Sequence, residues 1–192
     1  MTREGLRWAR DRHRGVFLFA NGGAIPYYER CGFTPLAEFV EFADVRPTLR
    51  REGAIRLDPG APGVSDRIFE YARRRAPVSD RFWVGNPRLL MFHALYTLRE
   101  HLYEIPDLDC LVLCAHEDGC LRLYDVVGER VPSLDELYPY IADPQDRTLE
   151  VHFHADKLGV EGLQPWPLED NNPFTFGRFP VKDVVFPYTS RA

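Results

Sequence analysis

The chain has 192 residues, 45% of them hydrophobic, and a formal net charge of −5. This length and composition are typical of a globular protein with one sizeable core or two small ones, and they exclude a disordered chain. The negative balance argues against general nucleic-acid binding, which needs an excess of cations, and no apolar run is long enough to predict a membrane span.

The first 46 residues predict helices and strands in alternation. A helix is expected over 2–14, where the apolar side chains fall on one face. The apolar run 16–20 predicts a strand, and the segment 24–30 predicts a short helix. The alternating run 36–42 predicts a second strand with one partly buried face.

The middle of the chain predicts a linker followed by two helices. Residues 47–63 contain three prolines and three glycines and are expected to form the linker, in which 54–57 has the composition of a short strand. A helix is predicted over 65–75, with Ser65 as its cap. The largely apolar stretch 86–103 predicts one long helix that is buried on several sides.

The last third of the chain predicts a β-hairpin and then mixed elements. The hairpin is expected over 109–115 and 120–127, because Asp118-Gly119 between them is a strong turn signal. Ser133 with Glu136 three residues later has the pattern of a capping box. The remaining predicted elements are a helix at 133–141, a strand at 149–155, and a last strand at 181–186 within a tail rich in proline and aromatic residues.

The most informative segment runs from Asn21 to Phe33. It has the pattern N-x-x-A-x-x-[FY]-Y-E-[KR]-x-G-[FW] and lies between two predicted strands. This pattern resembles the strand–helix–strand end of the GNAT acetyltransferase superfamily. The resemblance implies an α+β fold with a mixed, mainly antiparallel sheet flanked by helices. It also implies an acetyl-CoA-dependent N-acetyltransferase, with acetyl-CoA as co-substrate and a small-molecule or protein amine as acceptor.

The same resemblance implies roles for three residues. Acetyl-CoA would lie where two parallel strands splay apart, with Asn21 placing its amide near the co-substrate and Ala24 keeping the helix close to it. Tyr28 would be the proton donor to the departing CoA thiolate. The ordinary pKa is about 8.5 for a thiol and about 10 for a phenol. Tyr28 is therefore expected to stabilise the thiolate by a hydrogen bond as much as to protonate it, and to help the rate without being indispensable.

The resemblance also divides the chain. It implies the trailing half of a GNAT domain at 1–46, the linker at 47–63, and a GNAT-like second unit at 64–192 without a cofactor loop. The prediction of this second unit is based only on the order of its elements. Its loop at 128–132 lacks the glycines that would present backbone amides to a pyrophosphate. By register, the superfamily's cofactor loop, Q/R-x-x-G-x-G/A, falls just before Met1.

Three explanations for that register are open. The gene model begins at an internal methionine, a second chain completes the sheet as in a homodimer, or the second unit packs against the remnant to make a domain. The rival to the enzyme hypothesis is a non-catalytic GNAT-derived binding or assembly module that has lost the cofactor loop.

Histidines in the predicted strand 149–155 are candidate metal ligands. His152 and His154 alternate along it and Asp156 follows, a spacing that can hold a metal, with His93 or His116 as a third ligand. A solvated or substrate-facing strand surface is the alternative, and we predict no metal site.

Two further groups have alternative interpretations. The arginines 73–75 predict either a phosphate clamp or a solvated helix end favoured by the helix dipole. Cys110, Cys114 and Cys120 are expected to be small core residues. The four cysteines include no C-x-x-C pair, and no secretory signal is recognisable, so we expect free thiols and a cytoplasmic protein.

Overall fold

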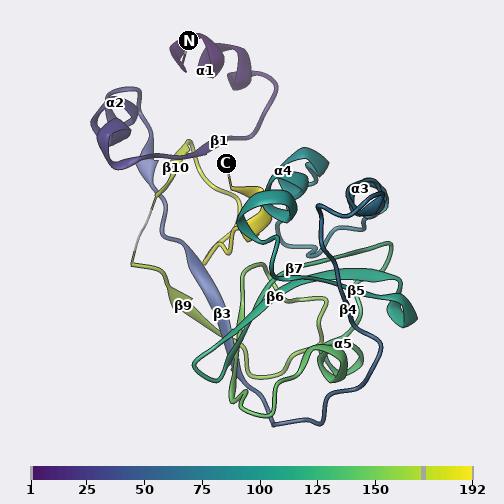
Figure 1. The fold of residues 1–192 in the computed structure, drawn as a ribbon. Coiled ribbons are helices and arrows are strands. Elements are labelled where there is room, and N and C mark those ends of the chain that lie inside the picture. The colour runs from purple at the N-terminus through teal and green to yellow at the C-terminus, as the bar shows by residue number, and fades with distance from the viewer. Residues whose placement is uncertain (1, 170–171, 192) are drawn as a thin grey trace. The chain divides into compact units, whose positions relative to one another are not determined.

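The computed structural model describes residues 2–169 and 172–191, so the predicted segments 1–46 and 64–192 include a few positions that lie outside the described residues. Figure 1 shows the ribbon. The α-helices are α1 (Thr2–Arg10), α2 (Ile25–Arg30), α3 (Val64–Arg74), α4 (Pro87–Phe92) and α5 (Leu134–Ile141). The short helical turns are η1 (Gly22–Ala24), η2 (His93–Thr97), η3 (Pro106–Leu108) and η4 (Tyr188–Ser190). The strands are β1 (Val16–Phe19), β2 (Thr34–Pro35), β3 (Phe39–Asp44), β4 (Ile55–Arg56), β5 (Leu102–Ile105), β6 (Cys110–Glu117), β7 (Cys120–Gly128), β8 (Thr148–Val151), β9 (Gln164–Pro167) and β10 (Pro173–Phe176).

The strands form two sheets. The smaller has the order β1-β10-β2, and both of its pairings are antiparallel. The larger has the order β4-β5-β6-β7-β8-β3-β9. In it, β7 and β8 run parallel, whereas the pairs β4–β5, β5–β6, β6–β7 and β3–β8 are antiparallel. This arrangement confirms the predicted α+β class with a mixed, mainly antiparallel sheet.

Backbone contacts divide the chain into two compact units. Unit 1 contains the described residues in 2–39 and 167–184, and unit 2 contains Val40–Trp166 and Val185–Arg191. Each unit is therefore built from more than one segment of the chain. This division is based on backbone contacts and does not show which segments descend from one ancestral domain. The expected division at 1–46, 47–63 and 64–192 therefore stays a prediction.

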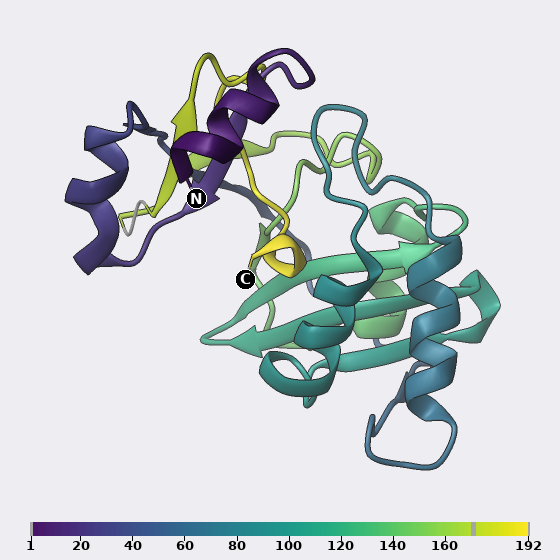
Figure 2. The same cartoon turned by 90° about the horizontal axis from the view of Figure 1, so that it is seen from above.

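Unit 1 holds the smaller sheet and the first two helices. The predicted strand at 16–20 is found as β1, and the predicted helix at 24–30 as η1 followed by α2. The predicted helix at 2–14 ends earlier, at Arg10, and is followed by a turn in which the backbone N–H groups of Arg12 and His13 both bond to the carbonyl of Ala9. β10 lies between β1 and β2, as Figure 2 shows for β1 and β10, with Leu18 opposite Phe174. Ala20, Phe33 and Phe174 form the buried core of the unit.

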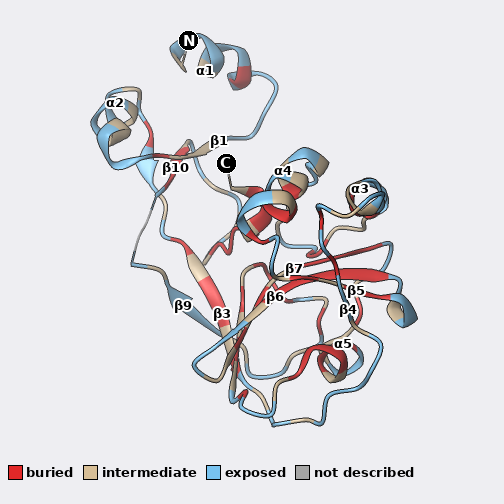
Figure 3. Cartoon of the chain, in the orientation of Figure 1, coloured by how far each residue is buried: buried red, intermediate tan, exposed pale blue. Residues whose placement is uncertain are grey.

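Unit 2 holds two apolar layers, one on each face of its sheet. α3 and α4 cover one face, and α5 covers the other (Figures 1 and 2). Figure 3 shows that the central strands β6 and β7 are mostly buried between these layers. None of the helices in the described part of the chain has the length and apolar character needed to cross a bilayer.

Local signals in unit 2 are confirmed. β6 and β7 form the predicted hairpin, and both turn residues have positive φ, 50° at Asp118 and 74° at Gly119, as a tight two-residue turn requires. The capping box is present at the start of α5, where Ser133 accepts a hydrogen bond from the backbone of Glu136 and the Glu136 carboxylate accepts one from the backbone of Ser133.

Three predictions of secondary structure were wrong. In the segment 86–103, the α-helix α4 ends at Phe92 and the π turn η2 follows it directly. The rest of the segment leads into strand β5 and is not helical, because Leu102 and Ile105 pair with β6 and bury their side chains there. Ser65 does not cap α3, which follows Gly63 at a φ of 77°. The strand expected at 181–186 is reduced to a single bridge between Glu38 and Val184.

Candidate functional site

Unit 1 contains a cavity of about 560 Å³ beside Tyr28. Its walls come from α1, from the turn that follows it, from β1, and from the two aromatic residues Tyr28 and Phe33. The lining residues are Thr2, Gly5, Leu6, Trp8, Ala9, His13, Gly15, Val16, Phe17, Leu18, Tyr28 and Phe33. The lining is therefore mainly apolar, and its side-chain polar groups are the Thr2 hydroxyl, a phenol, an imidazole and an indole.

Local packing positions the Tyr28 ring. Tyr28 lies in α2, is half-buried, and meets the Phe33 ring edge-on at a centroid distance of 5.8 Å. Phe33 is in turn fixed in the core against Phe176 of β10, with the ring centroids 5.7 Å apart. The Tyr28 hydroxyl makes no hydrogen bond to any residue in the described ranges 2–169 and 172–191. The phenol is thus oriented by its ring while its O–H group is available to a ligand.

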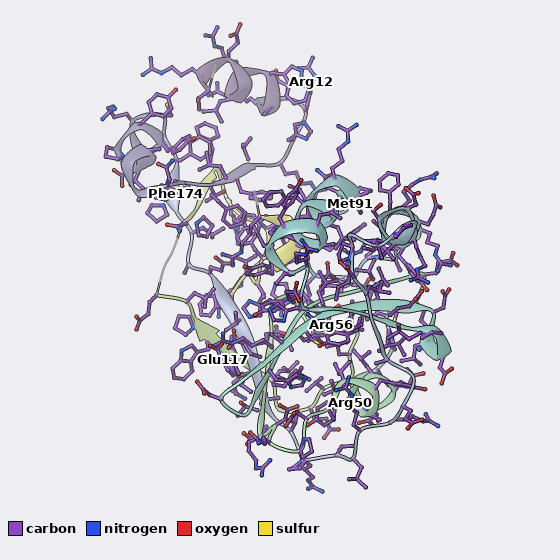
Figure 4. All side chains as sticks on the ribbon, viewed as in Figure 1. Arg12, Arg50, Arg56, Met91, Glu117 and Phe174 are labelled. Atoms are coloured by element: carbon purple, nitrogen blue, oxygen red, sulfur yellow. The ribbon has the colours of Figure 1, made fainter. Side chains whose placement is uncertain are left out.

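Trp8 and His13 form another part of the cavity wall. Their rings contact each other with centroids 5.1 Å apart, and Trp8 is 56% exposed although it is large and aromatic. The Arg12 guanidinium lies 5.3 Å from the Trp8 ring centroid (Arg12 is labelled in Figure 4). Sequence reasoning did not select Trp8 or His13. The available signal was a tryptophan among charged residues on a short predicted helix.

Asn21 and Ala24 are placed differently from Tyr28. The Asn21 side-chain oxygen accepts a hydrogen bond of 3.0 Å from the backbone N–H of Ala24 and caps η1. Neither residue is part of the cavity lining. Asn21 therefore fixes the start of the helical segment that carries Tyr28, while its amide N–H₂ group can still donate. Contact of Asn21 and Ala24 with a co-substrate stays a prediction.

The two histidines that are candidate metal ligands in the predicted strand 149–155 each have other partners. His154 is fully buried, with Nδ1 3.2 Å from a Glu41 carboxylate oxygen and Nε2 accepting a hydrogen bond from the backbone of Val185. His152 lies with Nε2 2.6 Å from a Glu150 carboxylate oxygen and its ring against Tyr124. Among the residues that the structure describes, no group of three or more His, Cys, Asp or Glu side chains is placed to hold a metal ion.

The two histidines considered as a third metal ligand, His116 and His93, also have other partners. Nδ1 of His116 lies 3.0 Å from Asp146, and His93 contacts the Thr97 hydroxyl and the carbonyl of Arg191. Burial lowers the pKa of His93 below its ordinary value. These imidazoles therefore stabilise local structure in unit 2.

The arginine run at the end of α3 is paired with carboxylates. Arg73 pairs with Glu70 at 3.3 Å, and Arg74 pairs with Asp109 at 2.6 Å. Arg75 is buried with Asp125, also at 2.6 Å. All three guanidinium groups are thus matched to carboxylates, which explains the run without a ligand.

The cysteines agree with the core interpretation at two positions. Cys110 and Cys114 are buried, and this burial raises the pKa of each thiol to about 12. Cys120 is only partly buried and lies at the start of β7. All four cysteines are free thiols.

No protein-family model matches the sequence, and no curated protein matches it. Among solved structures, a probable N-acyltransferase of unknown function from Enterococcus faecalis is 11% identical with a TM-score of 0.49, over 90% of this chain and 47% of that one. Eis1 from Mycobacterium abscessus is 16% identical with a TM-score of 0.43, over 90% of this chain and 50% of that one. A GCN5-related N-acetyltransferase from Sphaerobacter thermophilus is 16% identical with a TM-score of 0.37, over 96% of this chain and 69% of that one. The chain spans about half the length of the first two, and likenesses this weak carry no argument about its activity.

Proposed function

We propose that the chain is part of a GNAT-type N-acyltransferase and that the cavity beside Tyr28 receives the acyl-bearing arm of acetyl-CoA. The observation that carries the proposal is the Tyr28 phenol. It lines an apolar cavity of about 560 Å³, and its hydroxyl makes no hydrogen bond within the described part of the chain. The strand β1, the turn η1 and the helix α2 follow one another along the segment with the GNAT-like pattern, which supports the proposal, whereas the second predicted strand, 36–42, overlaps β3 of the larger sheet.

The proposed chemistry is direct acyl transfer. The acceptor amine attacks the thioester carbonyl carbon, a C–N bond forms, the C–S bond breaks, and the electron pair of the C–S bond leaves on the CoA sulfur. The amine proton passes to a general base. Tyr28 donates its O–H to the leaving sulfur, which stabilises the thiolate where negative charge develops. Asn21 and Ala24 would support the co-substrate, Asn21 through the amide N–H₂ group that its capping role leaves unused.

The cavity can be tested with S-acetyl-pantetheine, which is the uncharged arm of acetyl-CoA. At ten times its Kd, such a ligand stabilises the folded state by about 1.4 kcal/mol, which raises the melting temperature by roughly 3–6 °C for a chain of this size. Gly5 lines the cavity, and a Cβ added there meets no atom within 4 Å. Gly5→Leu should therefore fill part of the cavity without straining α1 and should abolish the rise.

Arg7→Leu is the matched control, because Arg7 is an exposed residue of the same helix and is not part of the lining. It adds a leucine to α1 outside the cavity and should leave the rise intact. If neither S-acetyl-pantetheine nor acetyl-CoA stabilises the wild-type chain in a dose-dependent way, the acyl-transfer proposal fails. The non-catalytic binding or assembly module then becomes the better account. A mass near twice that of one chain would instead favour the homodimer.

A further inference from the structure

Part of one sheet face in unit 2 is not covered by a helix. Residues of β3, β7 and β8 that alternate with core residues share this face, because Asp44 pairs in register with Thr148 and Phe42 pairs with Glu150. On the other side of β8, Cys120 pairs with Thr148 and Arg122 with Glu150. The intervening residues, such as Leu121, Leu149 and Val151, belong to the buried core on the α5 side.

A cavity of about 470 Å³ lies at the β9 end of this face. Its walls are Phe42 and Asp44 from β3, Thr148 from β8, and Gln164 and Trp166 from β9, together with Ala43 and Gly162. The Trp166 ring stands nearly perpendicular to the Phe42 ring, with centroids 6.5 Å apart, and Trp166 is 64% exposed. Two aromatic rings and three hydrogen-bonding side chains therefore border a cavity that is large enough for a small molecule.

Asp44 supplies the only charged group of the cavity wall within the described residues, and its carboxylate is unmatched. Asp44 is exposed, and its carboxylate forms no ion pair or hydrogen bond with another described residue. Glu150, a carboxylate on the same face, differs in this respect because it lies beside His152 and Arg122. Asp44 thus places a free negative charge beside two aromatic rings.

We propose that this cavity binds a small organic ammonium ion. A cation over an aromatic face is attracted by the ring quadrupole, most strongly for tryptophan, and Asp44 adds a direct charge interaction. The amide of Gln164 and the hydroxyl of Thr148 can hydrogen-bond the polar end of the same molecule. The unmatched carboxylate disfavours an anionic ligand. This site is independent of the Tyr28 cavity and includes no acyl transfer, so a quaternary ammonium ion that carries no N–H group fits it equally well.

The test compares choline with 3,3-dimethylbutan-1-ol, which has the same shape without the charge. The chain has three tryptophans, so binding can be followed on three indole N–H signals by NMR, and Trp166→Phe identifies the signal of Trp166. We expect choline to shift the Trp166 signal saturably and to bind about three- to tenfold more tightly than the neutral alcohol. Asp44→Asn should remove most of this preference. Asp66→Asn, which removes a similarly exposed carboxylate from α3, should leave it unchanged.

The comparison of the two ligands on the wild-type chain needs no variant, so a misfolded variant does not weaken it. Equal binding of choline and the alcohol, or no saturable shift of the Trp166 signal, would overturn the proposal. Saturable binding of a neutral sugar such as glucose, with no preference for choline, would assign the aromatic wall to carbohydrate instead.

Discussion

The buried ion pair between Asp125 and Arg75 gives the sharpest prediction about stability. Asp125 lies in β7 and is fully buried, and the Arg75 guanidinium at the end of α3 bonds both of its oxygens at 2.6 and 2.8 Å. The same carboxylate accepts hydrogen bonds from the backbone of Val126 and from the hydroxyl of Thr189. Asp125 therefore joins a strand, a helix end and the segment near the carboxyl end of unit 2.

The expected magnitude follows from what each substitution leaves behind. Asp125→Ala leaves a buried guanidinium without its partner, which should lower the free energy of unfolding by about 3–5 kcal/mol. Thr189→Val removes one hydrogen bond to a charged group and should cost about 1.5–3 kcal/mol. Arg73→Ala breaks the exposed pair with Glu70, in which both side chains are at least 60% exposed, and should change the free energy by no more than about 0.5 kcal/mol.

Urea unfolding followed by circular dichroism measures these changes. The double variant Arg75→Ala/Asp125→Ala completes a mutant cycle, and we expect it to be less destabilised than the sum of the two single variants, since neither charge is then left alone. A loss below about 1 kcal/mol for Asp125→Ala with an unchanged m value would refute the reasoning, because it would mean that Arg75 reaches water or another carboxylate at little cost.

Three other outcomes are expected. In a complex with CoA, Tyr28 should lower the pKa of the CoA thiol by about one to two units, as read from thiolate absorbance, and Tyr28→Phe should remove the shift; an identical pKa in both proteins would contradict a hydrogen bond to the sulfur. Burial lowers the pKa of His93 in the folded chain, so as the pH falls the imidazole is protonated in the unfolded chain first. The free energy of unfolding should therefore decrease as the pH drops below about 6.5. His93→Gln should flatten that dependence in urea titrations between pH 5 and 7.5, and an unaltered slope would assign it to other groups. Cys110 and Cys114 should resist an aromatic disulfide reagent at pH 8 until the chain unfolds, because their thiols are buried with pKa values of about 12, and rapid reaction of all four thiols would show that the core opens.

Features determined by neighbouring residues could be predicted from the sequence. Asp118-Gly119 determines its turn because both residues adopt positive φ, which few other pairs do readily. Ser133 and Glu136 bond to each other across a single helical turn. The Tyr28 segment belongs to the same class, since its strand, turn and helix follow one another within about 15 residues of sequence.

Features that depend on distant residues could not be predicted. The apolar stretch 86–103 has no period that separates a buried helix from a buried strand, and pairing with β6 decides the matter for its end at Leu102. The cavity walls at Trp8 and His13 depend on how α1 packs, which their own sequence does not reveal. Likewise, Asp44, Gln164 and Trp166 meet only because β3 and β9 are neighbours in the sheet.

The position of β10 has a consequence for synthesis of the protein. The strand that separates β1 from β2 is translated roughly 140 residues after β2, so at about 5–20 residues per second the ribosome needs roughly 7–28 s to produce it. Until then, both strands of the Tyr28 segment expose edges that can pair with other nascent chains. A chaperone that shields these edges on the ribosome should therefore raise the yield of folded protein more than one that acts after release.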